Sequence, residues 1–345
     1  MSRSILIISI LVCALTLAYW AMISFPLHTS SGETHEVLIT PGMSGKDIAN
    51  TLQEEGLIRS SFLFRIHILA SGNFRNLQAG EFLLSPSQSI RDITNILVQG
   101  KVLQRPLTVP EGWNVYNIAN LFEQKGLATT EDVYAMTGYP GANYQARPEL
   151  APLHDFSEKF PFLKEKPSSV SLEGYLFPET YFFASHDTAE QLIEKMLSTF
   201  EQRVVKRMEE DLQSNEMSLF EILTIASLIE KEVQHNEDKQ IVSGIIHKRL
   251  EAGMPLQIDA TITYLTGKRS TQVSVNDTQI ESPYNTYRNT GLPLGPIANP
   301  GEESIVATLN PVGTSYWFYL STPEGETIFS NTHEEHVKAK VLYLR

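Results

Sequence analysis

The chain opens with an almost unbroken apolar run of 21 residues, from Ile5 to Phe25. A helix of that length crosses the hydrocarbon core of a bilayer. Arg3 precedes the run and a polar linker, 26–34, follows it, so the positive-inside rule predicts a cytoplasmic tip of residues 1–4 and export of everything after the helix. A cleaved signal peptide is the alternative, but its apolar core is typically about 7–15 residues. We therefore expect a transmembrane helix over 5–25.

Two similar strand-turn-helix patterns follow the linker. Residues 35–40 alternate between apolar and polar like a half-buried strand, and a helical pattern begins soon after, at Ser44. Residues 105–113 repeat the strand and its turn, and residues 114–122 repeat the helix. The same periodicities predict helices over 61–70 and 89–98 and a strand over 77–84. We therefore expect a small domain over 35–104 and a second module with its connection over 105–165.

The second half of the chain has mostly helical periodicity, after a stretch rich in Pro and Gly, 138–170, that predicts a surface connection. Three helices are predicted, over about 188–212, from Ser218 to about Glu230, and over 238–252. Ser218 and Glu221 have the spacing of a capping box. Two strands are predicted over 315–320 and 326–330. The fold class that follows is mixed α+β, with a large domain over 166–345.

Glu230 stands out on the second of these helices. At about 100° per residue it falls in line with Leu219, Leu223 and Ala226, while Glu232 lies nearer the edge of the apolar face. A carboxylate on an apolar face is costly unless it is paired or neutral. Desolvation favours the protonated form, which suits a general acid near neutral pH. On the pattern alone, a partly buried ion pair with an Arg or Lys is the more ordinary interpretation.

Composition narrows the chemistry. The formal net charge is −13, which argues against nucleic acid as the main partner, because phosphate binding needs clustered Lys and Arg. The single cysteine, Cys13, lies in the apolar run, so the exported part forms no disulfide and no thiolate metal site. His333 and His336 are three residues apart and lack the H-E-x-x-H spacing of a zinc site. We therefore expect no metal and no cofactor.

Three clusters of aromatic, carboxamide and acidic residues lie in predicted loops, at 171–181, 255–264 and 282–301. An aromatic ring stacks on the C–H face of a sugar, and a carboxamide hydrogen-bonds its hydroxyl groups. Rigid turn chemistry, in which Asn and Asp bond the local backbone, is the alternative and fits most of 291–301. For Gln257 and Asn285 the two interpretations stay open.

Together these segments resemble the endolytic murein transglycosylases, the YceG-like (MltG) family. The motifs that carry the resemblance are L-E-G-Y-L-F-P-E-T-Y (172–181), A-S-L-I-E-K-E (226–232), L-Q-I-D-A-T (256–261), S-P-Y-N-T-Y (282–287) and G-L-P-L-G-P-I-A-N-P-G (291–301). Each is weak alone, but five in this order are specific. The resemblance implies LysM-like modules in the first half and a YceG-like catalytic domain over 166–345. It also implies that Glu230, the first Glu of the E-K-E motif, is catalytic.

The resemblance implies cleavage of the MurNAc–GlcNAc β-1,4 bond within a peptidoglycan strand, without water, to leave a 1,6-anhydroMurNAc end. Glu230 would act as acid and then as base, because the C6 hydroxyl of the substrate replaces the second carboxylate of most glycosidases. The substrate-binding residues that we expect are Glu173, Tyr175, Gln257, Asp259, Thr261, Ser282, Tyr284, Asn285 and Tyr287. A non-catalytic peptidoglycan-binding protein and a hydrolytic muramidase are the alternatives.

The resemblance and the apolar helix together imply a place of action. We expect a single-pass protein of the bacterial inner membrane, with a cytoplasmic N-terminus and a periplasmic catalytic part. The expected partners are peptidoglycan strands, the membrane itself and the peptidoglycan synthases, beside which cleavage would terminate or trim nascent strands.

Overall fold

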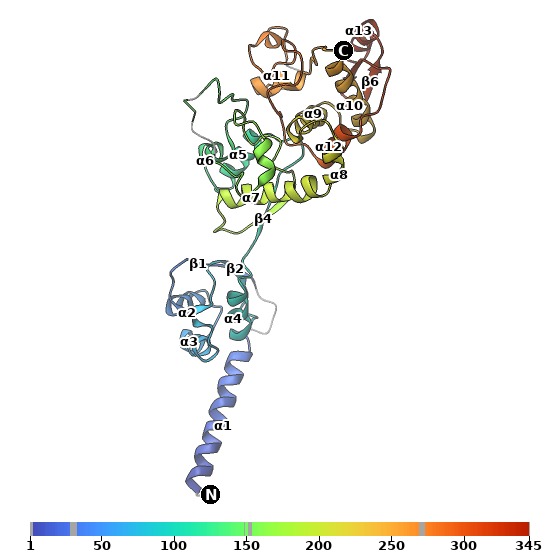
Figure 1. Ribbon diagram of the computed structural model, residues 1–345. Coiled ribbons are helices and arrows are strands. Elements are labelled where there is room, and N and C mark those ends of the chain that lie inside the picture. The colour runs from blue at the N-terminus through green and yellow to red at the C-terminus, as the bar shows by residue number, and fades with distance from the viewer. Residues whose placement is uncertain (1–2, 28–32, 148, 151–153, 269–272, 345) are drawn as a thin grey trace. The chain divides into compact units, whose positions relative to one another are not determined.

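The computed structural model describes residues 3–27, 33–147, 149–150, 154–268 and 273–344. The chain forms two compact units, whose elements are labelled in Figure 1. Unit 1 comprises Met1–Pro106 and Phe182–Asp187, and unit 2 comprises Leu107–Tyr181 and Thr188–Arg345. Helices alternate with short two-stranded sheets, which confirms the predicted α+β class.

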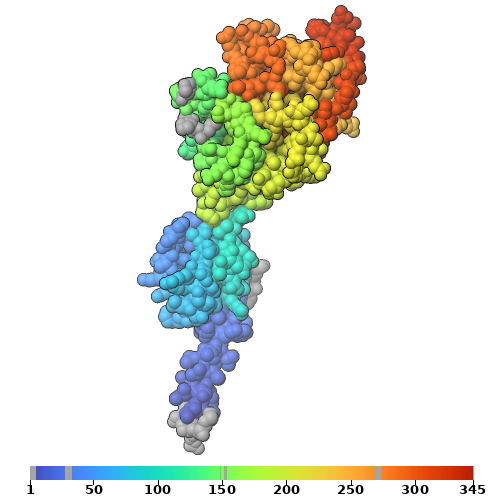
Figure 2. Space-filling view, in the orientation of Figure 1, coloured from blue at the N-terminus to red at the C-terminus, as the bar shows by residue number. Residues whose placement is uncertain are grey.

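The first helix, α1 (Arg3–Ser24), is apolar along most of its length. Its segment Ile5–Ser24 is long and apolar enough to cross a membrane. The space-filling view shows α1, in dark blue, projecting from the rest of unit 1 (Figure 2). Near its end Ile23 is buried, and the Tyr19 hydroxyl lies 3.4 Å from Nδ1 of His67. The expected apolar helix is therefore present, while its insertion into a membrane stays a proposal.

The globular part of unit 1 is a two-stranded sheet with three helices. Its elements are β1 (His35–Ile39), α2 (Gly45–Glu54), α3 (Ser61–Ala70), η1 (Asn73–Arg75), β2 (Gly80–Leu84) and α4 (Ile90–Gln99). The strands pair antiparallel, with Val37 opposite Phe82, and both side chains lie in one core with the helices. Ser44 and Ser89 close capping boxes at the starts of α2 and α4. These elements lie close to their predicted bounds.

The second strand-turn-helix module follows in the chain. Its elements are the strand β3 (Arg105–Thr108) and the helices α5 (Val115–Gln124) and α6 (Thr130–Thr137). The strand β3 pairs with β4 (Thr180–Phe183), which comes later in the chain. Asn114 caps α5 and Thr129 caps α6. The sequence did not predict α6, because two turns contain too few apolar positions to show a period. Between α6 and β4 the described residues form turns and one short helix, η2 (Pro161–Glu165), as expected for a connection.

Residues 188–212 form two helices and not one. α7 (Ala189–Phe200) is followed by a π-helical turn, η3 (Glu201–Lys206), and then by α8 (Glu209–Ser214). A π-turn holds more residues than an α-turn, and the side chains of Phe200, Val204 and Met208 in and around it are buried. The prediction of one continuous helix is therefore wrong, because the apolar pattern does not reveal this change of register.

Helix α9 (Leu219–Glu232) forms the centre of unit 2. The remaining elements are α10 (Asn236–Glu251), α11 (Asp259–Thr266), η5 (Asp277–Gln279), α12 (Glu302–Leu309), β5 (Phe318–Ser321), β6 (Thr327–Ser330) and α13 (His333–Tyr343). Every side chain from Ile222 to Ile229 is buried, and α10, α11 and α12 pack against α9 (Figure 1). Ser218 and Glu221 form the predicted capping box. Because α9 is enclosed in this way, the carboxyl groups at its C-terminal end have defined surroundings.

Candidate active site

Glu230 lies in the last turn of α9, where two other helices enclose its carboxyl group. Its side chain is 10% exposed. Oε2 accepts hydrogen bonds from Nζ of Lys239 at 3.4 Å, from the backbone N–H of Gly301 at 3.1 Å and from the Ser304 hydroxyl at 2.5 Å. Lys239 is itself buried. The structure therefore contains the partly buried ion pair that the sequence pattern left open.

A second carboxyl group, that of Glu111, lies beside Glu230. A Cβ added at Gly301 would lie 2.2 Å from the carboxyl carbon of Glu111, so the carboxyl group packs directly against this glycine. Burial and the negative charge of Glu230 both raise the pKa of Glu111, while Lys239 lowers it. These two carboxyl groups and one lysine form a compact charged cluster at the start of α12.

Glu232, two residues further along α9, lies in different surroundings. It lines a cavity of about 340 Å³. The other lining residues include Arg249, Gln257, Asp259, Tyr287 and Tyr319. Burial, and after it the negative charge of Asp259, raises the pKa of Glu232 to about 7, although hydrogen bonds with the Ala260 backbone and Tyr319 oppose the shift. A carboxyl group with this pKa is present as both acid and base near neutral pH.

Three of the predicted substrate-binding residues meet in the Glu232 cavity. Asp259 begins α11, and the hydroxyl of Tyr287 donates a hydrogen bond to its Oδ1 at 2.5 Å. Burial and this hydrogen bond raise the pKa of Tyr287, so its hydroxyl stays a neutral donor. Gln257 has a left-handed backbone with φ of 52°, a conformation that costs a non-glycine residue about 1–3 kcal/mol. With Glu232 and Tyr319, the cavity thus combines two carboxyl groups, two phenols and a carboxamide.

Glu173, which we expected to contact substrate, is only 1% exposed. Its carboxyl group accepts hydrogen bonds from the Val115 N–H at 3.1 Å, from the Tyr264 hydroxyl at 3.1 Å and from Nδ2 of Asn299 at 3.2 Å. Burial raises the pKa of Glu173 to about 8, although its bonds with Val115 and Tyr264 lower it. Glu173 therefore joins α5, α11 and the 299 loop, a position that supports a structural role.

Asn285 and Ser282 organise the loop that carries Tyr287. Nδ2 of Asn285 donates to two carbonyl oxygens upstream, at 3.0 and 2.7 Å, and its Oδ1 accepts from the Tyr287 N–H at 2.9 Å. Oγ of Ser282 accepts from the Tyr284 N–H at 3.2 Å. These bonds match the turn chemistry that was the alternative interpretation of Asn285. Asn285 acts directly on the position of Tyr287, and neither side chain is among the described residues that line the Glu232 cavity.

Tyr175, Thr261 and Tyr284 are buried in unit 2. The ring of Tyr175 packs against Phe200 at a centroid distance of 5.4 Å, and that of Tyr284 against Tyr264 at 5.3 Å. The Thr261 hydroxyl donates to a carbonyl oxygen one turn earlier, at 2.7 Å. All three side chains take part in the packing of unit 2, and none is among the described residues that line the Glu232 cavity.

Glu232, Arg249 and Tyr319 line the cavity but are not among the site residues predicted from the sequence. About 200° separates residues two apart on an α-helix, so Glu230 and Glu232 face different surroundings. The E-K-E spacing at a helix end was the available signal, because only one of its two Glu side chains could share the apolar face. Arg249 and Tyr319 gave no such signal, since α10 and β5 bring them to the cavity only in the folded chain.

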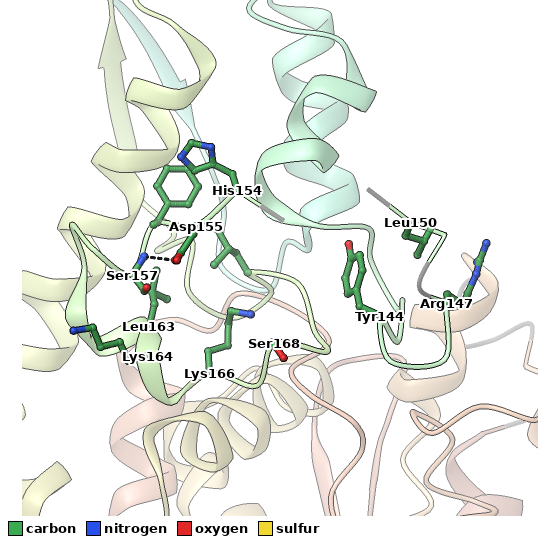
Figure 3. A pocket seen from close by; sticks show the side chains of 12 residues that line it. Tyr144, Arg147, Leu150, His154, Asp155, Ser157, Leu163, Lys164, Lys166 and Ser168 are labelled. Carbon is green, nitrogen blue, oxygen red and sulfur yellow. Dashed lines mark hydrogen bonds between the residues drawn. The ribbon is translucent and has the colours of Figure 1, made fainter. Parts of the chain in front are cut away.

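A larger cavity of about 620 Å³ lies among the loops of residues 144–172 (Figure 3). Its basic lining residues are Arg147, His154, Lys164 and Lys166. Burial lowers the pKa of Lys166 to about 8, and its Nζ donates to the Val170 carbonyl at 2.7 Å. Asp155 accepts from the Ser157 N–H, as the dashed line in Figure 3 shows. Neither Glu230 nor Glu232 is among the described residues that line it.

Within the described ranges, no group of three or more His, Cys, Asp or Glu residues could hold a metal ion. His333 begins α13, and its ring lies against that of Phe318 at a centroid distance of 5.8 Å. The ring of His336 stacks on Phe318 at a centroid distance of 5.4 Å. Both histidines therefore take part in the packing of α13 on β5.

Comparison with known proteins places the chain in a family. The model of the YceG-like family matches residues 37–341. The chain belongs to the YceG-like family. The endolytic murein transglycosylase of Bacillus subtilis strain 168 is 32% identical over 331 residues, which cover 92% of this chain and 87% of the relative. The resemblance seen in the motifs is confirmed.

Two further similar proteins support this assignment. The endolytic murein transglycosylase of Streptococcus pneumoniae D39 is 31% identical over 328 residues, although the match spans only 58% of that longer protein. The crystal structure of a yceG-like protein from Listeria monocytogenes aligns with 90% of this chain and 100% of its own, with a TM-score of 0.57 and 32% identity. The fold of this chain is therefore that of the family.

Proposed function

We propose that this YceG-like chain is a membrane-anchored endolytic lytic transglycosylase that cleaves peptidoglycan strands. The relatives are named endolytic murein transglycosylases, which supports the substrate class and the reaction type. In this chain the proposal depends most on the Glu232 cavity, where a carboxyl group of raised pKa faces Asp259, Tyr287 and Gln257. Such a group protonates a glycosidic oxygen, and its neighbours hydrogen-bond sugar hydroxyls.

Glu232 is the residue to which we assign the acid and base roles. Its neutral carboxyl group gives a proton to the oxygen between MurNAc C1 and GlcNAc C4, and the bond from C1 to that oxygen breaks. The MurNAc C6 hydroxyl then bonds to C1 and passes its proton to the Glu232 carboxylate. The acid is restored, no water is consumed, and the product has a 1,6-anhydroMurNAc end. One carboxyl group is sufficient because the nucleophile belongs to the substrate.

Asp259 supplies the electrostatic part of this mechanism. Positive charge develops at C1 as the glycosidic bond breaks, and a fixed carboxylate in the same cavity stabilises it. The short hydrogen bond from Tyr287 holds this carboxylate in one orientation. Asp259 also helps Glu232 to keep its proton, because its negative charge raises the pKa of Glu232.

Glu230 is the other candidate for the acid, because the family resemblance implies that the first Glu of E-K-E is catalytic. Its contacts support a structural role. Oε2 already accepts three hydrogen bonds, one of them from Lys239, so this oxygen is not available to exchange a proton with substrate. Glu230→Gln is therefore the matched control for Glu232→Gln, because it makes the same change two residues earlier on the same helix.

We further propose that α1 anchors the chain in the bacterial inner membrane with its N-terminus in the cytoplasm. The apolar segment Ile5–Ser24 supports the anchor, and the positive-inside rule supports the orientation. The β1–α2–α3–β2 order of unit 1 supports a LysM-like module that holds peptidoglycan. In this position, close to peptidoglycan synthases, the enzyme would cut nascent strands and limit their length. Protease added outside spheroplasts should digest both units, and protection of the units would contradict the orientation.

The ends of the products test the proposed reaction. The full-length protein in detergent is incubated with purified glycan strands, and the fragments are weighed by mass spectrometry. Anhydro ends, lighter by one water than the hydrolysed product, would support the proposal. Reducing MurNAc ends would establish a hydrolytic muramidase, and binding without cleavage would favour the non-catalytic alternative.

A further inference from the structure

Two more cavities in unit 2 follow the Glu232 cavity in a row. The middle cavity, about 220 Å³, shares Lys231 with the Glu232 cavity. The outer cavity, about 410 Å³, shares Tyr116 and Asn117 with the middle one. Nζ of Lys231 donates to the Gly112 carbonyl at 3.2 Å, which joins the end of α9 to the turn before α5. Each cavity therefore shares part of its wall with the next.

One face of α5 forms the outer cavity. Its lining includes Trp113, Tyr116, Asn117, Asn120 and Gln124, which we call the α5 face. Tyr116, Asn120 and Gln124 recur at intervals of four residues, and Asn117 lies three residues before Asn120, so they share one side of the helix. The opposite side is buried, through Val115, Ile118, Ala119 and Phe122. Because α5 is held by that apolar side, the α5 face is presented on a rigid element, and Tyr116 is 55% exposed on it.

The chemistry of the α5 face is unusual for a solvated helix surface in an acidic chain. Exposed helix faces commonly carry Lys, Arg, Glu and Asp, but the described residues that line the outer cavity carry aromatic rings, carboxamides and one leucine. The capping box with Asn114 explains why Asn117 is present, but it does not explain the other side chains of the α5 face. Rings that stack on C–H faces and amides that bond hydroxyl and acetamido groups suit a neutral N-acetylhexosamine. An anionic polymer would require cationic side chains here.

We propose that the α5 face binds sugar residues of the same glycan strand at a distance from the cleaved bond. This inference depends on the proposed function, because it takes the Glu232 cavity as the point of cleavage. A strand held across all three cavities has sugars on the far side of the middle cavity and is cut at an internal bond. Short fragments fill the Glu232 cavity without reaching Asn120 or Gln124, so the α5 face selects long strands.

Binding by an inactive chain tests this inference without cleavage. Full-length Glu232→Gln protein is titrated with long purified glycan strands and with tetrasaccharide fragments, and its affinity for each is measured. The same chain carrying Asn120→Ala and Gln124→Ala should bind long strands about tenfold more weakly, since two hydrogen bonds are lost. Its affinity for the tetrasaccharide should be unchanged. Glu123→Ala, an exposed change on the same helix, is the matched control and should have no effect.

The outcomes separate the two proposals. If Glu232→Gln protein binds long strands and the Asn120/Gln124 variant binds them equally well, the α5 face is not a subsite, and the proposed function stands. If Glu232→Gln protein binds neither substrate, the proposed function fails and this inference fails with it. In the active chain, the same double substitution should raise KM for long strands and leave kcat unchanged. A loss of kcat with a lower melting temperature would instead indicate damage to the fold and overturn the inference.

Discussion

Neutralising Asp259 should move the pH dependence of the reaction. Glu232 must be protonated to act as an acid, so activity is present below its pKa and is lost as the pH rises through about 7. Among its neighbours, Asp259 raises this pKa, whereas Arg249 and Tyr319 lower it. Asp259→Asn removes the raising charge and keeps the shape of the side chain. The basic limb of the kcat/KM profile should therefore shift to lower pH.

The size of the shift follows from the causes of the raised pKa. The pKa of Glu232 is about 7 against an ordinary 4.5, and a difference of roughly 2.5 units corresponds to about 3.4 kcal/mol. Burial is the larger cause and Asp259 the second, so we expect Asp259→Asn to remove about one unit. At pH 7.5 the protonated fraction of Glu232 would then fall from about one quarter to about one in thirty, roughly an eightfold loss. At pH 5.5 the Glu232 carboxyl group would remain mostly protonated in both the wild type and Asp259→Asn.

The assay is the initial rate of anhydro-product formation between pH 4.5 and 9, at one ionic strength, because salt screens charge interactions. A uniform loss of rate from weaker stabilisation at C1 would lower the whole profile without moving its limb. Tyr287→Phe keeps the Asp259 charge and serves as the control, with its limb near that of the wild type. An active Asp259→Asn enzyme whose basic limb coincides with the wild-type limb would refute the reasoning.

Three substitutions test the supporting structure, each measured by urea denaturation at pH 7. Lys239→Met leaves the carboxylate of Glu230 without its cationic partner and should lower the free energy of unfolding by about 2–3 kcal/mol, since that carboxylate keeps two other donors; a loss below about 0.5 kcal/mol would show that the pair is unimportant. Asn285→Ala should cost about 1–2 kcal/mol and reduce kcat/KM, because it frees the loop of Tyr287; an unchanged rate would contradict this role. Ser218→Ala removes the cap of α9 and should cost about 1 kcal/mol, whereas no change would show that tertiary packing alone sets the start of the helix.

Features that depend on neighbours within one or two turns could be predicted from the sequence. The capping box of Ser218 with Glu221 and the bounds of α3 are examples, because propensity, capping and apolar period act locally. Short helices such as α6 and α12 escaped prediction. Each has only two turns, too few for a period to emerge from the surrounding residues.

The surroundings of individual carboxyl groups could not be predicted, because they depend on distant segments. Helix geometry indicated that Glu230 is shielded from solvent, and its side chain is 10% exposed, but Ser304, which donates to it, is 74 residues further along the chain. The burial of Glu173 likewise depends on Tyr264, 91 residues away. The pattern could indicate that one Glu of the E-K-E motif faces inward. Only the packing of α10, α11 and β5 shows that the other Glu faces the cavity.

The most direct test of Glu232 as the acid and base compares two Gln variants of the full-length protein. Glu230→Gln and Glu232→Gln are incubated beside the wild type with the same glycan strands, and anhydro ends are counted by mass spectrometry, with melting curves to verify folding. We predict that folded Glu232→Gln protein releases no anhydro ends. Folded Glu230→Gln protein should keep substantial activity. Activity in Glu232→Gln together with none in a folded Glu230→Gln would contradict the assignment and make Glu230 the catalytic residue.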